Sequence, residues 1–207
     1  MYIPPYFKEE DKEELLAFIR QHPFATLVSQ VQGRPWATHL PFVADEEDGT
    51  LCLTTHMAKA NAQWKGFNGE EVLVVFQGPH AYISPSNYVK KDNVPTWNYI
   101  AVHAYGKVRL MEEAENEMVL LKMIAAFEAE FKQQYGQLDN KYLQGLLKGI
   151  VALEINVQEL QGKYKLSQNK LPEEKQQIIH SLMGTDDPSA QTLGLKMQAY
   201  YDKSQSS

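Results

Sequence analysis

The chain opens with a helical pattern of hydrophobic positions. Leu15, Leu16 and Ile19 have the spacing of one helix face, so we predict a helix from Lys12 to His22 with these side chains buried. Pro23 follows and cannot continue the helical hydrogen bonds, so the helix is expected to end there.

A succession of strand-like segments follows this helix. Apolar and β-branched residues gather in short runs that are separated by glycine and polar turns. We predict strands at 24–29, 34–43, 51–56, 72–76, 80–83 and 97–111, and a short helix at 58–67. Residues 72–76 are apolar at every position, which predicts a central strand buried on both faces. Closely spaced strands of this kind favour an antiparallel barrel.

The second half of the chain alternates between helical and strand patterns. Helical spacing predicts a long helix at 112–134, whose apolar stripe is Met118, Leu121, Ile124, Phe127 and Phe131. A further helix is predicted at 140–148 and a strand at 150–157. Proline and glycine signals then predict two closing helices, one at 172–184 and one from residue 188 onward.

These elements indicate an α+β chain that is mainly β and has peripheral helices. We expect one domain at 1–170 with inserted helices at about 112–148. Residues 171–203 form a C-terminal helical extension in this prediction, and 204–207 form a disordered tail.

The composition of the 207 residues narrows the class of protein. The formal net charge is −6, with 26 acidic against 20 basic residues, so direct DNA binding is not supported by charge. The chain shows no secretion signal and no apolar run of membrane-spanning length, so we expect a cytoplasmic protein without a membrane partner. Its single cysteine, Cys52, lies in an apolar run and is expected to be a packed strand residue.

The common enzyme signatures are absent from the sequence. We find no glycine-rich nucleotide loop, no zinc-binding H-E-x-x-H and no nucleophile elbow, so no catalytic residue is assigned. A metal site built from His39, His56, His80 and His103 would require several strands to bring them together, and we expect none.

Two segments carry unusual polar chemistry for a core. Residues 36–42 mix Thr38 and His39 with large aromatic side chains. Residues 54–61 run from a strand end into a helix start and offer hydroxyl groups, backbone N–H groups and Lys59, which suit a phosphate. The alternative, which spacing alone favours, is a capped helix with Lys59 in solvent.

Three further segments have both a functional and a structural interpretation. Residues 77–86 and 94–99 hold prolines near Tyr82 and Trp97. The two rings either line an aromatic ligand site or a dimer interface, or they belong to rigid surface turns packed against their own barrel. The pattern does not decide between these. Residues 163–170 are basic and polar, as is typical of a solvated strand end.

Five motifs together resemble a known family. H-L-P-F begins at His39, T-H-x-A-K-A-N-x-Q-W at Thr55, F-Q-G-P-H-A-Y-I-S-P-S at Phe76, V-P-T-W-N-Y-x-A-V-H-A-Y-G at Val94, and K-x-K-L-S-Q-N at Lys163. In this order they resemble the PaiB family of FMN-binding negative transcriptional regulators, over residues 1 to about 170.

The resemblance implies a fold, a cofactor and a set of cofactor-binding residues. It implies an antiparallel, Greek-key-like split β-barrel related to pyridoxamine-phosphate oxidase, acting as a homodimer with FMN at the subunit interface. The residues implied to bind FMN are Thr38, His39, Leu40, Pro41, Thr54, Thr55, His56, Lys59 and Asn61, with Gln77 and Trp97 from the neighbouring subunit. Unlike those oxidases, this turn has only Lys59, and the basic C-terminal substrate motif is missing, which argues against their reaction.

Three functions remain open from the sequence. The first is a flavin-binding regulator that acts through flavin or redox state rather than by reading DNA directly. The second is a small FMN-dependent oxidoreductase, in which the cofactor would carry hydride. The third is a haem-binding split barrel that uses the scattered histidines.

Overall fold

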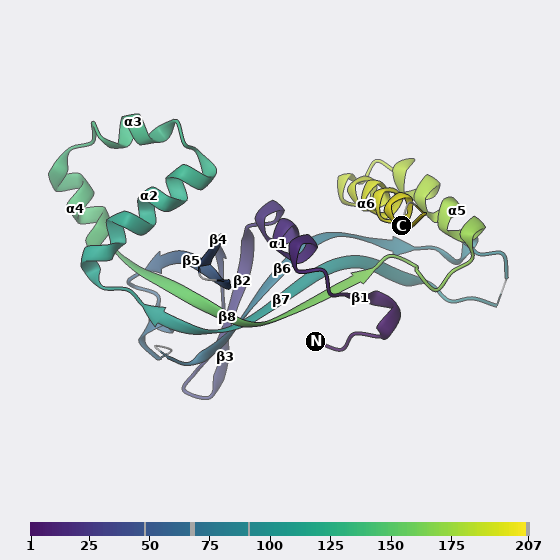
Figure 1. The fold of residues 1–207 in the computed structure, drawn as a ribbon, viewed down its shortest axis with the longest axis horizontal. Helices are drawn as coiled ribbons and strands as arrows, with labels where there is room; N and C mark the ends of the chain where they lie inside the picture. The colour runs from purple at the N-terminus through teal and green to yellow at the C-terminus, as the bar shows by residue number, and fades with distance from the viewer. Residues whose placement is uncertain (48, 67–68, 91, 206–207) are drawn as a thin grey trace. The chain divides into compact units, whose positions relative to one another are not determined.

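The computed structural model describes residues 1–47, 49–66, 69–90 and 92–205, and an eight-stranded, mainly antiparallel sheet dominates it (Figure 1). The strands are β1 (Lys8–Glu9), β2 (Phe24–Val31), β3 (Arg34–Pro41), β4 (Val43–Glu47), β5 (Thr50–Ala58), β6 (Glu71–Ile83), β7 (Thr96–Leu110) and β8 (Ile150–Lys165). Their order in the sheet is β3-β2-β6-β7-β8-β5-β4, with β1 paired to β8, so the described sheet is not closed. The prediction of a mainly antiparallel α+β chain is confirmed.

The helices lie at three places along the chain. They are α1 (Lys12–Gln21), α2 (Asn116–Phe127), α3 (Phe131–Tyr135), α4 (Asn140–Lys148), α5 (Pro172–Met183) and α6 (Pro188–Gln205), with short 3-10 segments η1 (Pro5–Phe7), η2 (Ala62–Gly66), η3 (Pro85–Asn87) and η4 (Glu113–Glu115). The predicted stripe of α1 is confirmed, because Leu15, Leu16 and Ile19 are all buried. Helix α6 includes two residues of the expected disordered tail, and the last two residues lie outside the described part.

The chain divides into two compact units. Unit 1 comprises residues 1–11, 77–102 and 161–207, and unit 2 comprises residues 12–76 and 103–160. Strands β6, β7 and β8 have residues in both units.

In unit 2, the β2–β3 hairpin has one buried and one half-exposed face. A turn at Gln32–Gly33, with both φ values positive, joins the strands. Ala25, Leu27 and Ser29 point into the core. The opposite surface, here called the hairpin face, consists of Thr26, Val28, Ala37, His39, Leu73 and Val75, which the strand register places side by side.

The hairpin face corrects one expectation from the sequence. Val72, Val74 and Phe76 are buried, but Leu73 and Val75 are only half-buried, so residues 72–76 are not buried on both faces. Strand geometry sends alternate side chains to opposite faces, and only one face of β6 meets the core here. An apolar surface is thus left partly accessible.

In unit 1, α5 and α6 cover one face of the β6–β7–β8 segment (Figure 1). Asn98 of β7 is fully buried, and its Nδ2 donates to Ser167 Oγ at 2.8 Å and lies 3.6 Å from Met197 Sδ of α6. Ser189 Oγ of α6 donates to the His80 carbonyl at 2.8 Å and accepts from the His80 N–H at 3.1 Å. These bonds fix α6 to the strands.

The predicted helix at 112–134 is wrong in its length and in its buried face. The chain forms η4, α2 and α3 in turn, because the backbone leaves helical geometry at Glu128, where φ is −156°. Val119 and Met123 pack in a cluster with Met111 and Ala152, whereas Met118 and Phe127 are exposed. Helix α2 is apolar around most of its surface, so the sheet beneath it selects the face.

Two shorter elements also differ from expectation. Strand β5 continues to Ala58, and η2 replaces the helix expected at 58–67, whose last residue lies outside the described part. The segment expected as one strand at 34–43 breaks at Phe42, whose N–H donates to the Pro23 carbonyl at 2.9 Å instead of to a neighbouring strand. The buried Phe42 ring packs edge-on against Phe76.

Within the described residues, no helix is long and apolar enough to cross a membrane. The same residues contain no group of three or more histidine, cysteine, aspartate or glutamate side chains arranged to hold a metal ion.

Candidate functional site

Two of the motif segments meet at a hydrogen-bonded cluster in unit 2. Asn61 Nδ2 donates to Thr38 Oγ1 at 2.9 Å, which joins the start of η2 to β3. The Thr38 hydroxyl in turn donates to Gln63 Oε1, and the Gln63 N–H donates to Asn61 Oδ1 at 3.0 Å. Two residues that the resemblance implied for cofactor binding, Thr38 and Asn61, are therefore neighbours.

Gln63 holds this cluster against the β2–β3 hairpin. Its side chain is fully buried, and Nε2 lies 3.0 Å from Ser29 Oγ, 3.3 Å from the Trp36 carbonyl and 3.4 Å from the Leu27 carbonyl. Gln63 lies in the T-H-x-A-K-A-N-x-Q-W motif but was not among the residues predicted to bind the cofactor. A buried amide with this many partners fixes the position of η2.

The other cofactor-binding candidates on β3 follow Thr38 and alternate between the two faces of the strand. His39 is exposed and stacks on Phe24, with ring centroids 6.3 Å apart and an interplanar angle of 24°. Leu40 is buried in the core, and the Pro41 carbonyl accepts a hydrogen bond from Thr55 Oγ1 at 2.6 Å. Only Thr38, His39 and Pro41 are accessible to a ligand.

The β5 candidates do not converge on one point. Thr55 is fully buried and bonded to Pro41, whereas its neighbours Thr54 and His56 point the other way, toward α2. Lys59 Nζ lies 3.2 Å from Glu113 Oε2 in an exposed ion pair, and the Lys59 N–H donates to the Gly149 carbonyl at 2.8 Å. The two threonine hydroxyls therefore do not form a phosphate cradle with Lys59.

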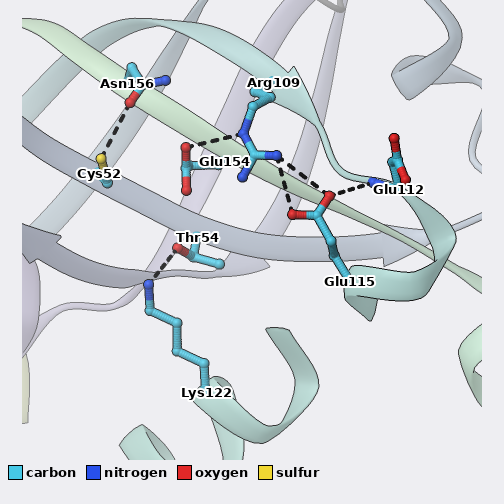
Figure 2. Close-up of polar contacts among 8 residues, drawn as sticks. All are labelled: Cys52, Thr54, Arg109, Glu112, Glu115, Lys122, Glu154 and Asn156. Atoms are coloured by element: carbon cyan, nitrogen blue, oxygen red, sulfur yellow. Dashed lines mark hydrogen bonds and ion pairs between the residues drawn. The ribbon is translucent and has the colours of Figure 1, made fainter. Parts of the chain in front are cut away.

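A cation that sequence reasoning missed lies beside Thr54. Figure 2 shows Lys122 reaching from α2 to β5, where its Nζ donates to Thr54 Oγ1 at 3.1 Å. The same Nζ lies 2.8 Å from Asp45 Oδ2 of β4. The only sequence signal was a lysine on an otherwise apolar helix.

Arg109 forms a second polar contact on this side of the sheet (Figure 2). Its guanidinium lies 3.4 Å from Glu154 Oε1 of β8 and 3.3 Å from Glu115 Oε1 of η4. The Glu112 N–H donates to Glu115 Oε2 at 2.7 Å, and this bond, followed by the Arg109 contact, lowers the pKa of the Glu115 carboxyl. Arg109 thereby anchors the start of α2 to the sheet.

Next to these contacts, Cys52 is buried as predicted. Its Sγ lies 3.3 Å from Asn156 Oδ1 on the adjacent strand (Figure 2).

Gln77 and Trp97 belong to unit 1. Gln77 is exposed on β6. Trp97 of β7 is 53% exposed, and its ring lies 6.1 Å from the ring of His80 and 6.1 Å from the ring of Tyr82. Of the two interpretations of this segment, an aromatic wall describes these side chains better than a turn packed against its own barrel, since half of the Trp97 surface is open.

A pocket of about 610 Å³ opens beside the buried Gln63 cluster in unit 2. Ser29, which bonds Gln63, is part of its wall. The pocket is lined by Val28, Ser29, Gln30, Gly33, Pro35, Gly66, Glu70, Glu71, Val72, Leu73 and Tyr105. Its volume lies in the range of small-molecule sites, but none of the residues proposed from the sequence lines it.

His56 makes the stability of the protein depend on pH. Its Nδ1 lies 3.1 Å from Met123 Sδ, and burial lowers the pKa of the imidazole below its ordinary 6.5. As the pH falls through about 6.5, the unfolded chain takes up a proton that the folded chain does not, so stability falls.

We expect His56→Gln to flatten this loss between about pH 7.5 and about pH 5.5, measured as urea midpoints at each pH. His180→Gln, at an exposed position on α5, is the control and is expected to leave the profile unchanged. An unchanged profile in His56→Gln would contradict the assignment.

The residues of unit 2 fit the implied FMN in part. The hairpin face and the His39–Phe24 ring pair offer flat apolar and aromatic cover for an isoalloxazine. Lys59 and Asn61, two residues apart in sequence, offer the two kinds of group that bind a phosphate, a cation and an amide donor. Thr54 and Thr55 do not fit, because their hydroxyls are engaged with Lys122 and Pro41.

Comparison with known proteins identifies relatives along nearly the whole chain. A family model described as "Putative FMN-binding domain" matches residues 1–159. The protease synthase and sporulation protein PAI 2 of Bacillus subtilis is 42% identical over 201 residues, which are 96% of this chain and 97% of that protein. The PaiB resemblance seen in the motifs is confirmed by these matches.

Solved structures share the fold at low sequence identity. The flavocytochrome Anf3 from Azotobacter vinelandii has a TM-score of 0.59 and 16% identity, covering 79% of this chain and 72% of that one. A FAD- and haem-binding protein from Mycobacterium smegmatis has a TM-score of 0.57 and 15% identity, covering 76% and 73%. The predicted split-barrel fold is confirmed, with a sheet that is not closed in the described residues.

Proposed function

Because this chain belongs to the FMN-binding domain family and is a split-barrel protein of the PaiB type, we propose that it holds FMN beside β3 and η2 and uses the flavin state in transcriptional regulation. His39 and Pro41 lie along the isoalloxazine on the hairpin face, Thr38 positions Asn61 from the opposite face of β3, and Lys59 and Asn61 bind the phosphate. Bound FMN supplies a ring that accepts and returns electrons.

The observation that carries this proposal is the hydrogen bond between Asn61 and Thr38. It brings the two motif segments that the family resemblance assigns to FMN into contact, and Gln63 supports both of them, through its buried side-chain amide at Thr38 and its backbone N–H at Asn61. Lys59 follows the end of β5 and is 46% exposed at its side chain, so it can exchange Glu113 for a phosphate at small cost.

The proposed assembly is a homodimer with FMN at the subunit interface, to which Gln77 and Trp97 of the neighbouring subunit contribute. Split-barrel flavoproteins commonly dimerise. The accessible apolar hairpin face and the exposed Trp97 ring support an interface, since large apolar surfaces that remain open on a protomer often meet a partner.

The proposed regulation acts through the flavin rather than through direct contact with DNA. The net charge of −6 leaves no excess of basic residues to neutralise phosphates. The name of the Bacillus subtilis relative associates that protein with protease synthesis and sporulation. In this proposal the chain acts on transcription by sensing flavin or redox state, or through a partner, rather than by reading DNA itself.

Retention of FMN by the purified protein tests the site. We expect wild-type protein to keep a flavin absorption band after FMN addition and desalting, and Lys59→Ala to lose about tenfold in affinity, because a charge-assisted bond to phosphate is removed.

Lys65→Ala is the matched control, since Lys65 lies in η2 and lies over the ring of its neighbour Trp64. Equal retention in Lys59→Ala and Lys65→Ala would reject the phosphate assignment. Turnover of a nicotinamide cofactor by the FMN-loaded protein would favour the oxidoreductase alternative.

A further inference from the structure

Unit 1 has an exposed surface that combines aromatic rings with lysines. Trp97 and Tyr82 are 53% and 52% exposed, and their rings meet edge to face with centroids 6.1 Å apart. Tyr99 lies two residues beyond Trp97 on β7, so both side chains point to the same face, about 7 Å apart along the strand. We call this surface the aromatic–lysine face; its residues are His80, Tyr82, Trp97, Tyr99, Lys163 and Lys165.

The lysines of this face have neutral partners. Lys163 Nζ lies 5.3 Å from the centre of the Tyr99 ring and donates to the Tyr2 carbonyl at 3.0 Å. Lys165 Nζ donates to Thr96 Oγ1, next to Trp97. In the described part of the chain, neither lysine forms an ion pair with a carboxylate.

The two ammonium groups also act on each other. Burial and the nearby charge of Lys163 lower the pKa of Lys165. Lys8 of β1 is directly opposite Lys163 in the strand register, and its charge is paired with Glu10. An anion placed between Lys163 and Lys165 would relieve their repulsion, which no carboxylate does in the described structure.

The opposite side of the same strands is already occupied. Asn98, which alternates with Trp97 and Tyr99, is fully buried against Ser167 and α6. The rigid packing of that side holds the aromatic–lysine face in place without a ligand. A preformed surface of this kind loses little conformational freedom on binding.

We propose that the aromatic–lysine face binds a planar aromatic anion, with its ring stacked on Trp97 and Tyr82 and its anionic group held by Lys163 and Lys165. Aromatic side chains bind bases through their faces, and ammonium groups hold phosphate as point charges. Two lysines match a single phosphate better than a polyanion, which the net charge of −6 also disfavours. A mononucleotide has this chemistry, and so has FMN.

Binding of an aromatic anion to the aromatic–lysine face does not require the proposed FMN site beside β3 and η2. Trp97 is the one residue assigned both to the aromatic–lysine face and to the FMN site. Lys163 and Lys165 belong only to the aromatic–lysine face, and FMN retention is expected to depend on Lys59 instead. A free nucleotide and a flavin share this ligand chemistry, and competition between them separates a nucleotide site from the neighbouring subunit's part of the proposed FMN site.

Calorimetric titration of FMN-free protein with AMP, in a buffer without phosphate, tests the proposal. We expect AMP to bind about tenfold more tightly than either adenosine or inorganic phosphate, because each of these lacks one of the two contacts. This comparison uses the unmodified protein, so it does not depend on the folding of a variant.

Variants then locate the binding. Trp97→Leu and Lys163→Ala are each expected to weaken AMP binding about tenfold. Lys175→Ala is the control, since Lys175 also lies over an aromatic ring, that of Tyr201 at 4.8 Å, but belongs to α5. The control should bind AMP as the wild type does.

Competition with FMN decides between these two sites. If saturating FMN leaves AMP binding unchanged, the face takes a free nucleotide at a site of its own, which supports the proposal. If FMN displaces AMP in a manner that requires Lys163, the face is the neighbouring subunit's part of the FMN site, which would overturn it. The proposal would also be overturned if AMP bound no better than phosphate, or if the Lys163→Ala and Lys175→Ala variants bound AMP equally. Such a failure would leave the Lys59-dependent flavin band unchanged, so it can be told apart from a failure of the proposed FMN site.

Discussion

Replacement of Gly106 by alanine is expected to destabilise the protein by about 3 kcal/mol, the upper end of the usual cost of overpacking. A Cβ at this position of β7 would lie 2.4 Å from the Asn156 carbonyl oxygen and 2.8 Å from Ile155 Cγ2. The oxygen belongs to the backbone of β8, so β7 and β8 must separate to admit the methyl group. Urea unfolding followed by tryptophan fluorescence measures the loss as a lower midpoint.

Gly145→Ala is the matched control for this substitution. Gly145 lies within α4, and a Cβ there would meet no heavy atom within 4 Å. Because alanine restricts the unfolded chain and suits a helix, we expect this variant to be about 0.5–1 kcal/mol more stable than the wild type. Equal midpoints for the two variants would contradict the close approach of β7 and β8.

The strands and their turns were predictable because they depend on local pattern. The β2–β3 hairpin follows from two extended runs around Gln32–Gly33, where the backbone needs positive φ values. The same alternation could have corrected the β5 assignments, since Thr54 and Thr55 are neighbours on a strand and must point to opposite faces. Both were nevertheless assigned to one phosphate.

The buried face of α2 was not predictable in this way. Apolar residues occur around most of this helix, so more than one stripe satisfies a helical period. The structure buries Val119 and Met123 because Met111 and Ala152 lie beneath them, and these partners come from β8 and from the residue after β7. Only the tertiary arrangement brings them together.

The candidate site was predictable as a set of segments but not as a set of contacts. The motifs drew attention to residues 36–42 and 54–61, and Thr38 and Asn61 of these segments do meet. The side chain that joins them, Gln63, has partners more than twenty residues away in sequence, at Thr38, Trp36 and Ser29. Gln63 joins these segments because its side chain is buried among them, and the presence of one polar residue in a motif does not show that it is buried.

Replacement of Gln63 by leucine is accordingly expected to affect stability and FMN binding together. Leucine fills a similar volume but leaves the Ser29 hydroxyl and the Trp36 carbonyl without the amide that they contact in the core. An unsatisfied buried polar group costs about 1–3 kcal/mol, so we expect a total loss of about 3 kcal/mol in the free energy of unfolding.

The effect on FMN separates the structural role of Gln63 from its role in the site. Without the Gln63 side chain, the Thr38 hydroxyl, which accepts from Asn61, loses the acceptor that holds it in register, so FMN retention should fall even where the variant is fully folded. Gln133→Leu, on the exposed surface of α3, is the control and should retain FMN. A folded Gln63→Leu variant that retains FMN as well as the wild type would place the flavin away from Thr38 and Asn61, because the support that the Gln63 side chain gives Thr38 would then be dispensable.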